Sequence, residues 1–227
     1  MTLTIIVPVL NEAAGIEAAL TALAPLRARG VEIVVIDGGS SDDTAALARP
    51  LAERMLTAPR GRAAQMNAGA TAATGDVLLF LHADTRLPAG ADRLELDRLA
   101  RARRHWGRFD VRFDGGHRLR VVATMMNLRS RVTGIATGDQ AMFVTRAAFE
   151  RVGGFPPIAL MEDVALSARL KRIGRPLNLR ARVTTSGRRW RENGFLRTLL
   201  LMLWLRLAYF FGGDPARLAR RYGYAQN

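Results

Sequence analysis

The sequence has no cysteine among its 227 residues and a single lysine, Lys171. Without cysteine the chain can form no disulfide framework, thiolate metal site or thiol nucleophile. Nearly all of the 34 basic side chains are therefore arginines, and against 20 acidic residues they give a formal net charge of +14. Such a charge attracts phosphorylated ligands, nucleic acid or anionic lipid. No nucleic-acid recognition motif accompanies it, so we expect no nucleic-acid partner.

The sequence also lacks internal repeats, linkers and low-complexity tracts, and 49% of its residues are hydrophobic. A chain of this length and composition is expected to fold as one globular domain. The first predicted strand begins within a few residues of Met1, which leaves no room for a signal peptide. We therefore expect a cytoplasmic enzyme.

The first half alternates short apolar runs with helical patterns, which is typical of an α/β protein with a mostly parallel sheet flanked by helices. The expected strands are Leu3–Val9, Val31–Asp37, Met55–Thr57 and Val77–Leu81. The expected helices are Ala13–Leu23, Asp43–Leu51, Ala63–Ala73 and Ala91–Arg103.

From Trp106 onward the pattern changes, because Phe109, Val111 and Phe113 alternate with charged residues. That period predicts a half-exposed antiparallel or edge strand. The later expected elements are the helix Leu119–Leu128, the strand Ala141–Thr145, the helix Val164–Ile173, and short strands at Pro176–Leu179 and Arg182–Thr185. A nucleotide-binding half, 1–104, and an acceptor-binding half, 105–194, in one continuous sheet is the simplest architecture.

Polar groups come directly after three of the predicted strands. Asp37 ends one strand and precedes two glycines, and His82-Ala83-Asp84 comes after another; the first strand leads into Asn11 and Glu12. Open α/β sheets bind their ligands at the carboxyl ends of the strands. These groups therefore predict a site for a nucleotide and a metal.

Two later segments add candidate chemistry. Arg60 and Arg62 lie in a basic, glycine-containing loop before a helix, where backbone N–H groups and guanidinium groups can hold a diphosphate. Glu162 and Asp163 begin a predicted helix. They are either an acidic pair favoured by the helix dipole or the site of a general base.

Together these motifs, from Thr4 to about Trp190, resemble those of the family-2 glycosyltransferases, inverting enzymes of the GT-A (Rossmann-like) fold that use nucleotide-sugars. The resemblance implies that Pro8, Asn11 and Glu12 touch the base and ribose, and that Asp37 accepts a hydrogen bond from the base. Asn67 matches an Asn-x-Gly element of the family.

His82-Ala83-Asp84 stands in the place of the family's Asp-x-Asp, which implies a divalent cation, Mn²⁺ or Mg²⁺, held by Asp84. His82 either joins the metal or hydrogen-bonds the ribose or a nearby loop. Asp139 either accepts from a sugar hydroxyl or serves in a turn. Asp163, beside Glu162, is by the resemblance the base that deprotonates the acceptor.

Ser186-Gly187-Arg188-Arg189-Trp190 lies where processive relatives carry Gln-x-x-Arg-Trp. The glutamine is missing, so we expect transfer of one sugar, with Arg188 or Arg189 neutralising the departing diphosphate. A UDP-sugar is the family's usual donor and GDP-mannose is the alternative. The compact chain resembles a small bacterial subgroup associated with arsenosugar-type metabolism, and the acceptor is a small molecule or a lipid-linked phosphate.

Two rival functions remain open. A sugar-1-phosphate nucleotidyltransferase would carry a glycine-rich, basic signature directly after the first strand, where this chain has Val9-Leu10-Asn11-Glu12. A non-catalytic membrane or protein adaptor would have no need to retain Asp37, Asp84 and Asp163 together.

The segment Phe195–Phe211 predicts an apolar helix within a C-terminal extension, 195–227. It is shorter than the roughly 20 apolar residues of a membrane span, and it contains Arg197 and Arg206. At about 100° per residue these arginines lie on opposite sides, so the helix has no single polar face. We expect it to contact a second copy of the chain or, as a peripheral protein, the inner face of a membrane.

Overall fold

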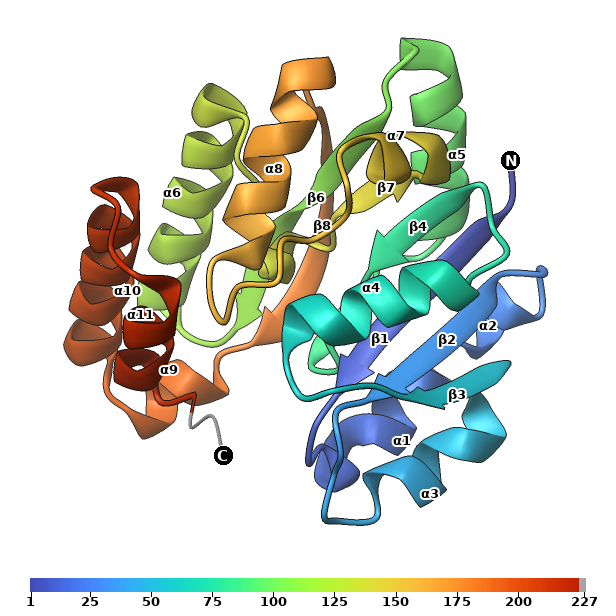
Figure 1. Ribbon diagram of the computed structural model, residues 1–227, viewed down its shortest axis with the longest axis horizontal. Helices are drawn as coiled ribbons and strands as arrows, with labels where there is room; N and C mark the ends of the chain where they lie inside the picture. Colours follow the sequence, from blue (N-terminus) through green and yellow to red (C-terminus); the bar gives the residue numbers. More distant parts are fainter. Residues whose placement is uncertain (225–227) are drawn as a thin grey trace.

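The computed structural model describes residues 1–224, with every side chain in that range except that of Glu95. One eight-stranded sheet forms the centre of the molecule, and helices pack on both of its faces (Figure 1). The strands are β1 (Leu3–Val9), β2 (Glu32–Asp37), β3 (Arg54–Thr57), β4 (Val77–Phe80), β5 (Thr85–Arg86), β6 (Trp106–Asp114), β7 (Phe143–Thr145) and β8 (Leu177–Ser186).

Helices occupy most of the chain between the strands. They are α1 (Ala13–Thr21), α2 (Ala24–Arg27), α3 (Thr44–Ala48), α4 (Arg62–Ala72), α5 (Ala91–Ala102), α6 (His117–Thr133), α7 (Arg146–Arg151), α8 (Glu162–Ile173), α9 (Arg188–Glu192), α10 (Phe195–Phe210) and α11 (Pro215–Tyr222). There are also two short 3₁₀ turns, η1 (Arg49–Leu51) and η2 (Gly138–Gln140). The predicted α/β class with a mostly parallel sheet is confirmed.

The strand order is β3-β2-β1-β4-β7-β6-β8-β5. The first four strands are mutually parallel, with Val9 opposite Asp37 at the ends of β1 and β2. Their carboxyl ends therefore meet at one edge of the sheet, where the sequence predicted a ligand site. The second half joins the same sheet, because β7 pairs antiparallel with β4.

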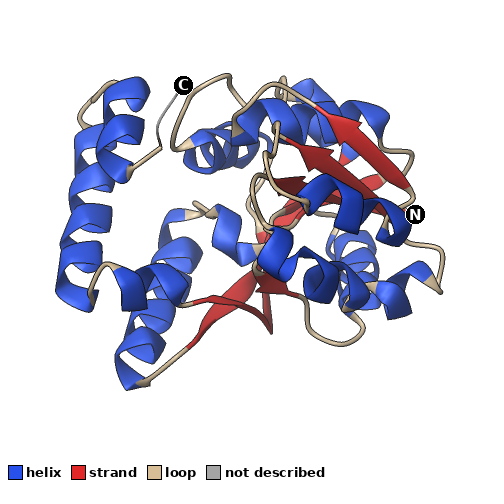
Figure 2. Cartoon of the chain, turned by 90° about the horizontal axis from the view of Figure 1, so that it is seen from below, coloured by secondary structure: helices blue, strands red, loops and turns tan. Residues whose placement is uncertain are grey.

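Successive side chains of each strand point to opposite faces of the sheet, and this divides the core into two layers. Ile5 and Val7 of β1 join a cluster with residues of α1, α2, α5 and α6, whereas Ile6 packs with residues of α4, α7 and α8 on the other face. Successive side chains of a strand point to opposite faces, so a strand covered on both faces is apolar throughout. The sheet, seen from another side in Figure 2, thus lies between two sets of helices.

The prediction of an edge strand over 109–113 is wrong, and that of a half-exposed strand holds only at the end of β6, where Arg112 and Asp114 are exposed. β6 lies between β7 and β8, and Arg108 and Asp110 are buried. Arg108 Nε donates to Ser130 Oγ at 3.1 Å, its Nη1 contacts Asp110, and Arg131 binds the same carboxylate at 2.7 Å. Arg108 and Asp110 therefore attach α6 to the sheet instead of facing water. The antiparallel part of the prediction holds for the pairing of β6 with β7.

Other elements of the second half differ from the predicted ones in length. The two short strands predicted at 176–185 form one strand, β8, which pairs with β6 over its length with an irregularity between Phe109 and Asp110. Helix α6 extends beyond the predicted 119–128 at both ends. Helix α8 begins at Glu162 and ends before Gly174, close to the predicted limits.

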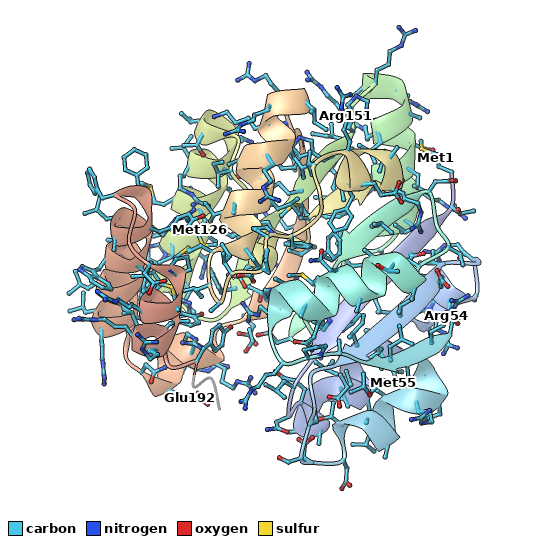
Figure 3. The ribbon with its side chains drawn as sticks, in the orientation of Figure 1. Met1, Arg54, Met55, Met126, Arg151 and Glu192 are labelled. Carbon is cyan, nitrogen blue, oxygen red and sulfur yellow. The ribbon has the colours of Figure 1, made fainter. Side chains whose placement is uncertain are left out.

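Helices α9, α10 and α11 lie together at one end of the molecule (Figure 1). Leu205 of α10 packs with Leu218 and Ala219 of α11 and with Leu160 in a small separate core. The domain therefore covers one side of α10, and Figure 3 shows side chains of the opposite side projecting outward. Within residues 1–224, no helix combines the length and apolarity that a membrane crossing needs. The predicted extension, 195–227, ends in three residues outside the described range.

Candidate active site

Asp37 ends β2 in a buried position at the carboxyl edge of the sheet. Ser40 donates its hydroxyl to Asp37 Oδ1 at 2.5 Å, and its backbone N–H lies 3.1 Å from the same carboxylate. The Asn11 N–H donates to Ser40 Oγ at 2.9 Å, and Asn11 Oδ1 accepts from the Ser41 N–H at 2.9 Å. Hydrogen bonds therefore join the turns after β1 and β2 into one corner of the site.

Gln65 of α4 completes this corner and was not predicted from the sequence. Its buried amide donates to the carbonyl oxygens of Val9 at 2.8 Å and Ile36 at 2.9 Å. A Cβ on Gly38 would lie 3.0 Å from the Gln65 amide, so the glycine leaves room for the Gln65 side chain. A single buried glutamine gives no signal in sequence, because its partners are backbone atoms of distant strands.

Glu162, which is buried, and Asp163, which is half-buried, form an acidic pair at the start of α8. Burial is the main cause that raises the pKa of Glu162 to about 7, and the charge of Asp163 adds to it. Burial also raises the pKa of Asp163. The Gly138 N–H, which donates to Asp163 Oδ2 at 2.7 Å, lowers this pKa in part. Arg62 lowers the pKa of both carboxyls, so its positive charge acts on both acids of the pair.

His82 and Asp139 meet on the same side of the site, with His82 Nδ1 3.5 Å from Asp139 Oδ1. Burial alone would raise the pKa of Asp139, but the contact with His82 and the charges of Arg62 and Arg189 lower it overall. This contact is the one expected if His82 bonds a nearby loop, one of the alternatives that the sequence left open. The two residues join β4 to η2 across the site.

Asp84 lies exposed after β4, with half-buried Ala83 before it. Burial raises the pKa of Glu12, Arg188 at 3.8 Å opposes this, and the negative charge of Asp84 raises it further. Within residues 1–224, no three His, Asp or Glu side chains are grouped closely enough to hold a metal ion. A cation at Asp84 would need oxygen ligands from a bound phosphate, which is the usual arrangement for Mg²⁺.

Arg62 and Arg189 are each stacked on a tyrosine of the C-terminal segment. The Arg62 guanidinium lies 5.4 Å from the centre of the Tyr224 ring, and that of Arg189 lies 4.0 Å from the centre of Tyr222. Arg189 Nη1 also donates to the Tyr222 carbonyl oxygen at 3.3 Å. Burial would lower the pKa of Arg62, but Tyr224 and Glu162 outweigh it, so the guanidinium stays charged. The sequence analysis missed both tyrosines because they lie beyond the last recognised motif.

Several predicted site residues have structural contacts of their own. Both amide atoms of Asn67 bond the backbone of Phe155, at 2.9 and 3.0 Å. Trp190 packs against the rings of Phe113 and Phe195. Pro8 is inside β1, one residue before its end, and Arg60 is exposed in the loop before α4. Their roles in nucleotide-sugar binding stay predictions.

Arg129 of α6 is a further feature that was not predicted from the sequence. Its three guanidinium nitrogens are shielded from solvent and have no hydrogen-bond partner within residues 1–224. Burial lowers the pKa of Arg129, and the charge of Asp163 raises it in part. A buried cation thus lies within electrostatic reach of the acidic pair.

The model of the family described as Glycosyl transferase family 2 matches residues 4–151 of this chain. The chain belongs to glycosyltransferase family 2. It is also similar to the PGL/p-HBAD biosynthesis glycosyltransferases of Mycobacterium tuberculosis and Mycobacterium bovis, with 39% identity over 105 residues. The aligned region is 43% of this chain and 39% of each relative, so the chain matches about two fifths of the relatives' length.

Solved structures of glycosyltransferases share the fold of this family member. The mannosyltransferase PcManGT from Pyrobaculum calidifontis, in complex with GDP-Man and Mn²⁺, has a TM-score of 0.62 at 25% identity and covers 80% of this chain and 56% of its own. TarS from S. aureus has a TM-score of 0.69 at 18% identity, covering 82% and 60%. Glucosyl-3-phosphoglycerate synthase from Mycobacterium tuberculosis, with Mn²⁺, UDP-Glc and phosphoglyceric acid, has a TM-score of 0.61 at 18% identity, covering 81% and 70%. The GT-A fold and the membership of glycosyltransferase family 2 predicted from the motifs are confirmed.

Proposed function

We propose that this glycosyltransferase moves one sugar from a nucleotide-sugar to a small-molecule or lipid-linked acceptor, with inversion at the anomeric carbon. A UDP-sugar is the expected donor and GDP-mannose is the alternative. The observation that carries the proposal is the acidic pair of buried Glu162 and half-buried Asp163, whose pKa values Arg62 lowers, at the carboxyl edge of the sheet. The arsenosugar-type likeness remains a narrower prediction within it. Location at the inner face of a membrane is also part of the proposal.

Asp163 serves as the general base. Inversion needs one carboxylate that accepts the acceptor's proton while its oxygen attacks from the side opposite the diphosphate. The Gly138 N–H, 2.7 Å from Oδ2, and the Val164 N–H, 2.7 Å from Oδ1, hold the Asp163 carboxylate in one orientation. A base held in this way loses little freedom when the acceptor binds.

Arg62 and Arg189 bind the donor's diphosphate through charge-assisted hydrogen bonds. Asp37 and Asn11 meet the base and ribose at the corner that Ser40 holds. Asp84, near Glu12, would hold Mn²⁺ or Mg²⁺ together with phosphate oxygens. Such a cation neutralises the charge that develops on the leaving diphosphate.

The proposal is tested first by donor binding. A panel of UDP-sugars and GDP-mannose, each with and without Mn²⁺, is scored for the rise in melting temperature, because a ligand specific for the folded state stabilises it. We expect a UDP-sugar to give the largest rise, and only with the metal. No rise with any nucleotide-sugar would contradict the proposal.

The base is tested with Asp163→Asn, which should retain donor binding and lower transfer about 10²–10⁴-fold. Asp97→Asn, at an exposed position of α5, is the matched control. Transfer by Asp163→Asn within a few-fold of wild type would remove Asp163 from this role.

A further inference from the structure

Helix α10 exposes one continuous apolar face. Phe210 and Phe211 are 80% and 76% exposed. At about 100° per residue, the exposed apolar side chains of this segment fall within an arc of about 120°. They are Leu196, Leu200, Leu203, Trp204, Leu207, Phe210 and Phe211. The buried Thr198 and Leu205 lie on the opposite side, against the domain.

Arg197 and Arg206 border this face. At about 100° per residue, each lies about 20–40° beyond one edge of the exposed arc. The sequence analysis placed them on opposite sides of a helix with no polar face. The structure shows why both positions suit one surface, because long arginine stems can lie beside an apolar face while their charges stay in water.

Helix α6 carries a second stripe of the same kind. Its exposed apolar residues have the spacing i, i+4, i+7, i+11, which places them on one face. They are Val121, Met125, Leu128 and Val132. The guanidinium of Arg118 in α6 lies 5.8 Å from the centre of the Phe195 ring in α10, so the first turns of the two helices meet. Figure 1 shows both helices at the same end of the molecule.

The charges around these stripes are mostly positive, although exposed Asp114, Glu192 and Asp214 lie just before α6, α10 and α11. Neither α6 nor α10 contains an acidic residue, and Arg118, Arg120 and Arg197 are exposed on them. Helix α11 adds exposed Arg217 and Arg220. Apolar side chains edged by arginines complement a surface with negative headgroups above an apolar interior.

We propose that the exposed faces of α10 and α6 dock onto an anionic lipid bilayer, with α10 lying in the headgroup region. At 16 residues α10 is too short to cross a bilayer, but with one side packed on the domain its exposed apolar side can lie along the bilayer surface. A second copy of the chain is the poorer occupant, because pairing these faces would bring two arginine-rich patches together. The inference rests on this surface and not on the proposed sugar transfer.

Vesicle flotation of the full chain tests the proposal. We expect binding to vesicles of phosphatidylcholine with phosphatidylglycerol and at least tenfold weaker binding to phosphatidylcholine alone. Binding should weaken between about 0.1 M and about 1 M salt, because exposed charges are screened. The Leu203→Glu/Leu207→Glu variant should lose at least tenfold in vesicle binding, whereas Leu94→Glu, at an exposed position on α5, should bind like wild type.

Trp204 supplies a readout that does not depend on activity. Its exposed side chain lies on the apolar face, so brominated lipids should quench part of the tryptophan fluorescence, and Trp204→Phe should remove that part. Phe210→Ser/Phe211→Ser, two exposed positions at the end of the helix, should reduce vesicle binding without affecting the folded core. A protein that ignores anionic vesicles overturns the proposal. A dimer that Leu203→Glu/Leu207→Glu dissociates, with no vesicle binding, also overturns it and assigns the face to a second copy.

Discussion

Glu162→Gln is expected to raise the free energy of unfolding at about pH 8 and to leave it nearly unchanged at about pH 5. Burial first and the charge of Asp163 second raise the pKa of Glu162 from 4.5 to about 7. The folded protein therefore holds this proton more tightly than the unfolded chain does. For wild type, the contribution of Glu162 is complete below pH 4.5 and is lost as the pH rises toward about 7.

The size of the effect comes from the pKa difference. At about 1.4 kcal/mol per unit, wild type loses about 3 kcal/mol by pH 8 and less than about 1 kcal/mol by pH 5. Glutamine keeps the shape of the side chain but carries no charge, so it escapes this loss. The stability difference between variant and wild type should grow by about 2 kcal/mol from about pH 5 to about pH 8.

Urea unfolding at a series of pH values, monitored by tryptophan fluorescence, measures this difference. Glu150→Gln, at an exposed position of α7, is the control and should show no such growth. A difference of the same size at both ends of the series would refute the reasoning. It would mean that Glu162 does not titrate abnormally in the folded state.

The structure also predicts the effects of three further substitutions. Asp84→Ala should abolish the Mn²⁺ dependence of UDP binding in a calorimetric titration; an unchanged dependence would remove Asp84 from the metal site. Tyr224→Ala should weaken UDP binding several-fold, since Arg62 loses the ring that holds it, whereas Tyr224→Phe should bind like wild type. Arg129→Met should raise the free energy of unfolding by about 1–4 kcal/mol in urea, because it removes a buried cation that no group within residues 1–224 pairs. A destabilised Arg129→Met variant would show that the charge is compensated.

The first half of the fold was predictable because its strands are buried on both faces. Ile33–Ile36 and Val77–Phe80 are apolar throughout, and such runs have few alternatives to a central strand. The polar residues just beyond these strands were predictable for the same reason, since the end of a buried strand fixes their place at the sheet's edge. Asp37 and Asp84 accordingly lie at the carboxyl edge of the sheet.

The second half was harder because its polar residues find distant partners. Nothing in the local pattern of 108–114 separates a solvated face from one buried against Ser130 and Arg131 of α6. Periodicity showed that Phe195–Phe210 is apolar, but not which side the chain covers, since that depends on Leu160 and Leu218. Tyr222 and Tyr224 reach Arg189 and Arg62 only through the tertiary fold.

The packing of α10 against α11 links the exposed apolar face of α10 to the two tyrosines beside the candidate site. Leu205 and Leu218 share one small core, and Arg221 stacks 4.5 Å from the centre of the Trp204 ring. Whatever holds α10 in place therefore also restrains Tyr222 and Tyr224 beside Arg189 and Arg62. If α10 lies on a bilayer as proposed, lipid contact would also restrain these tyrosines, so we expect vesicles to change the rate of transfer to a water-soluble acceptor. The C-terminal helices would then set the enzyme's rate as well as its location.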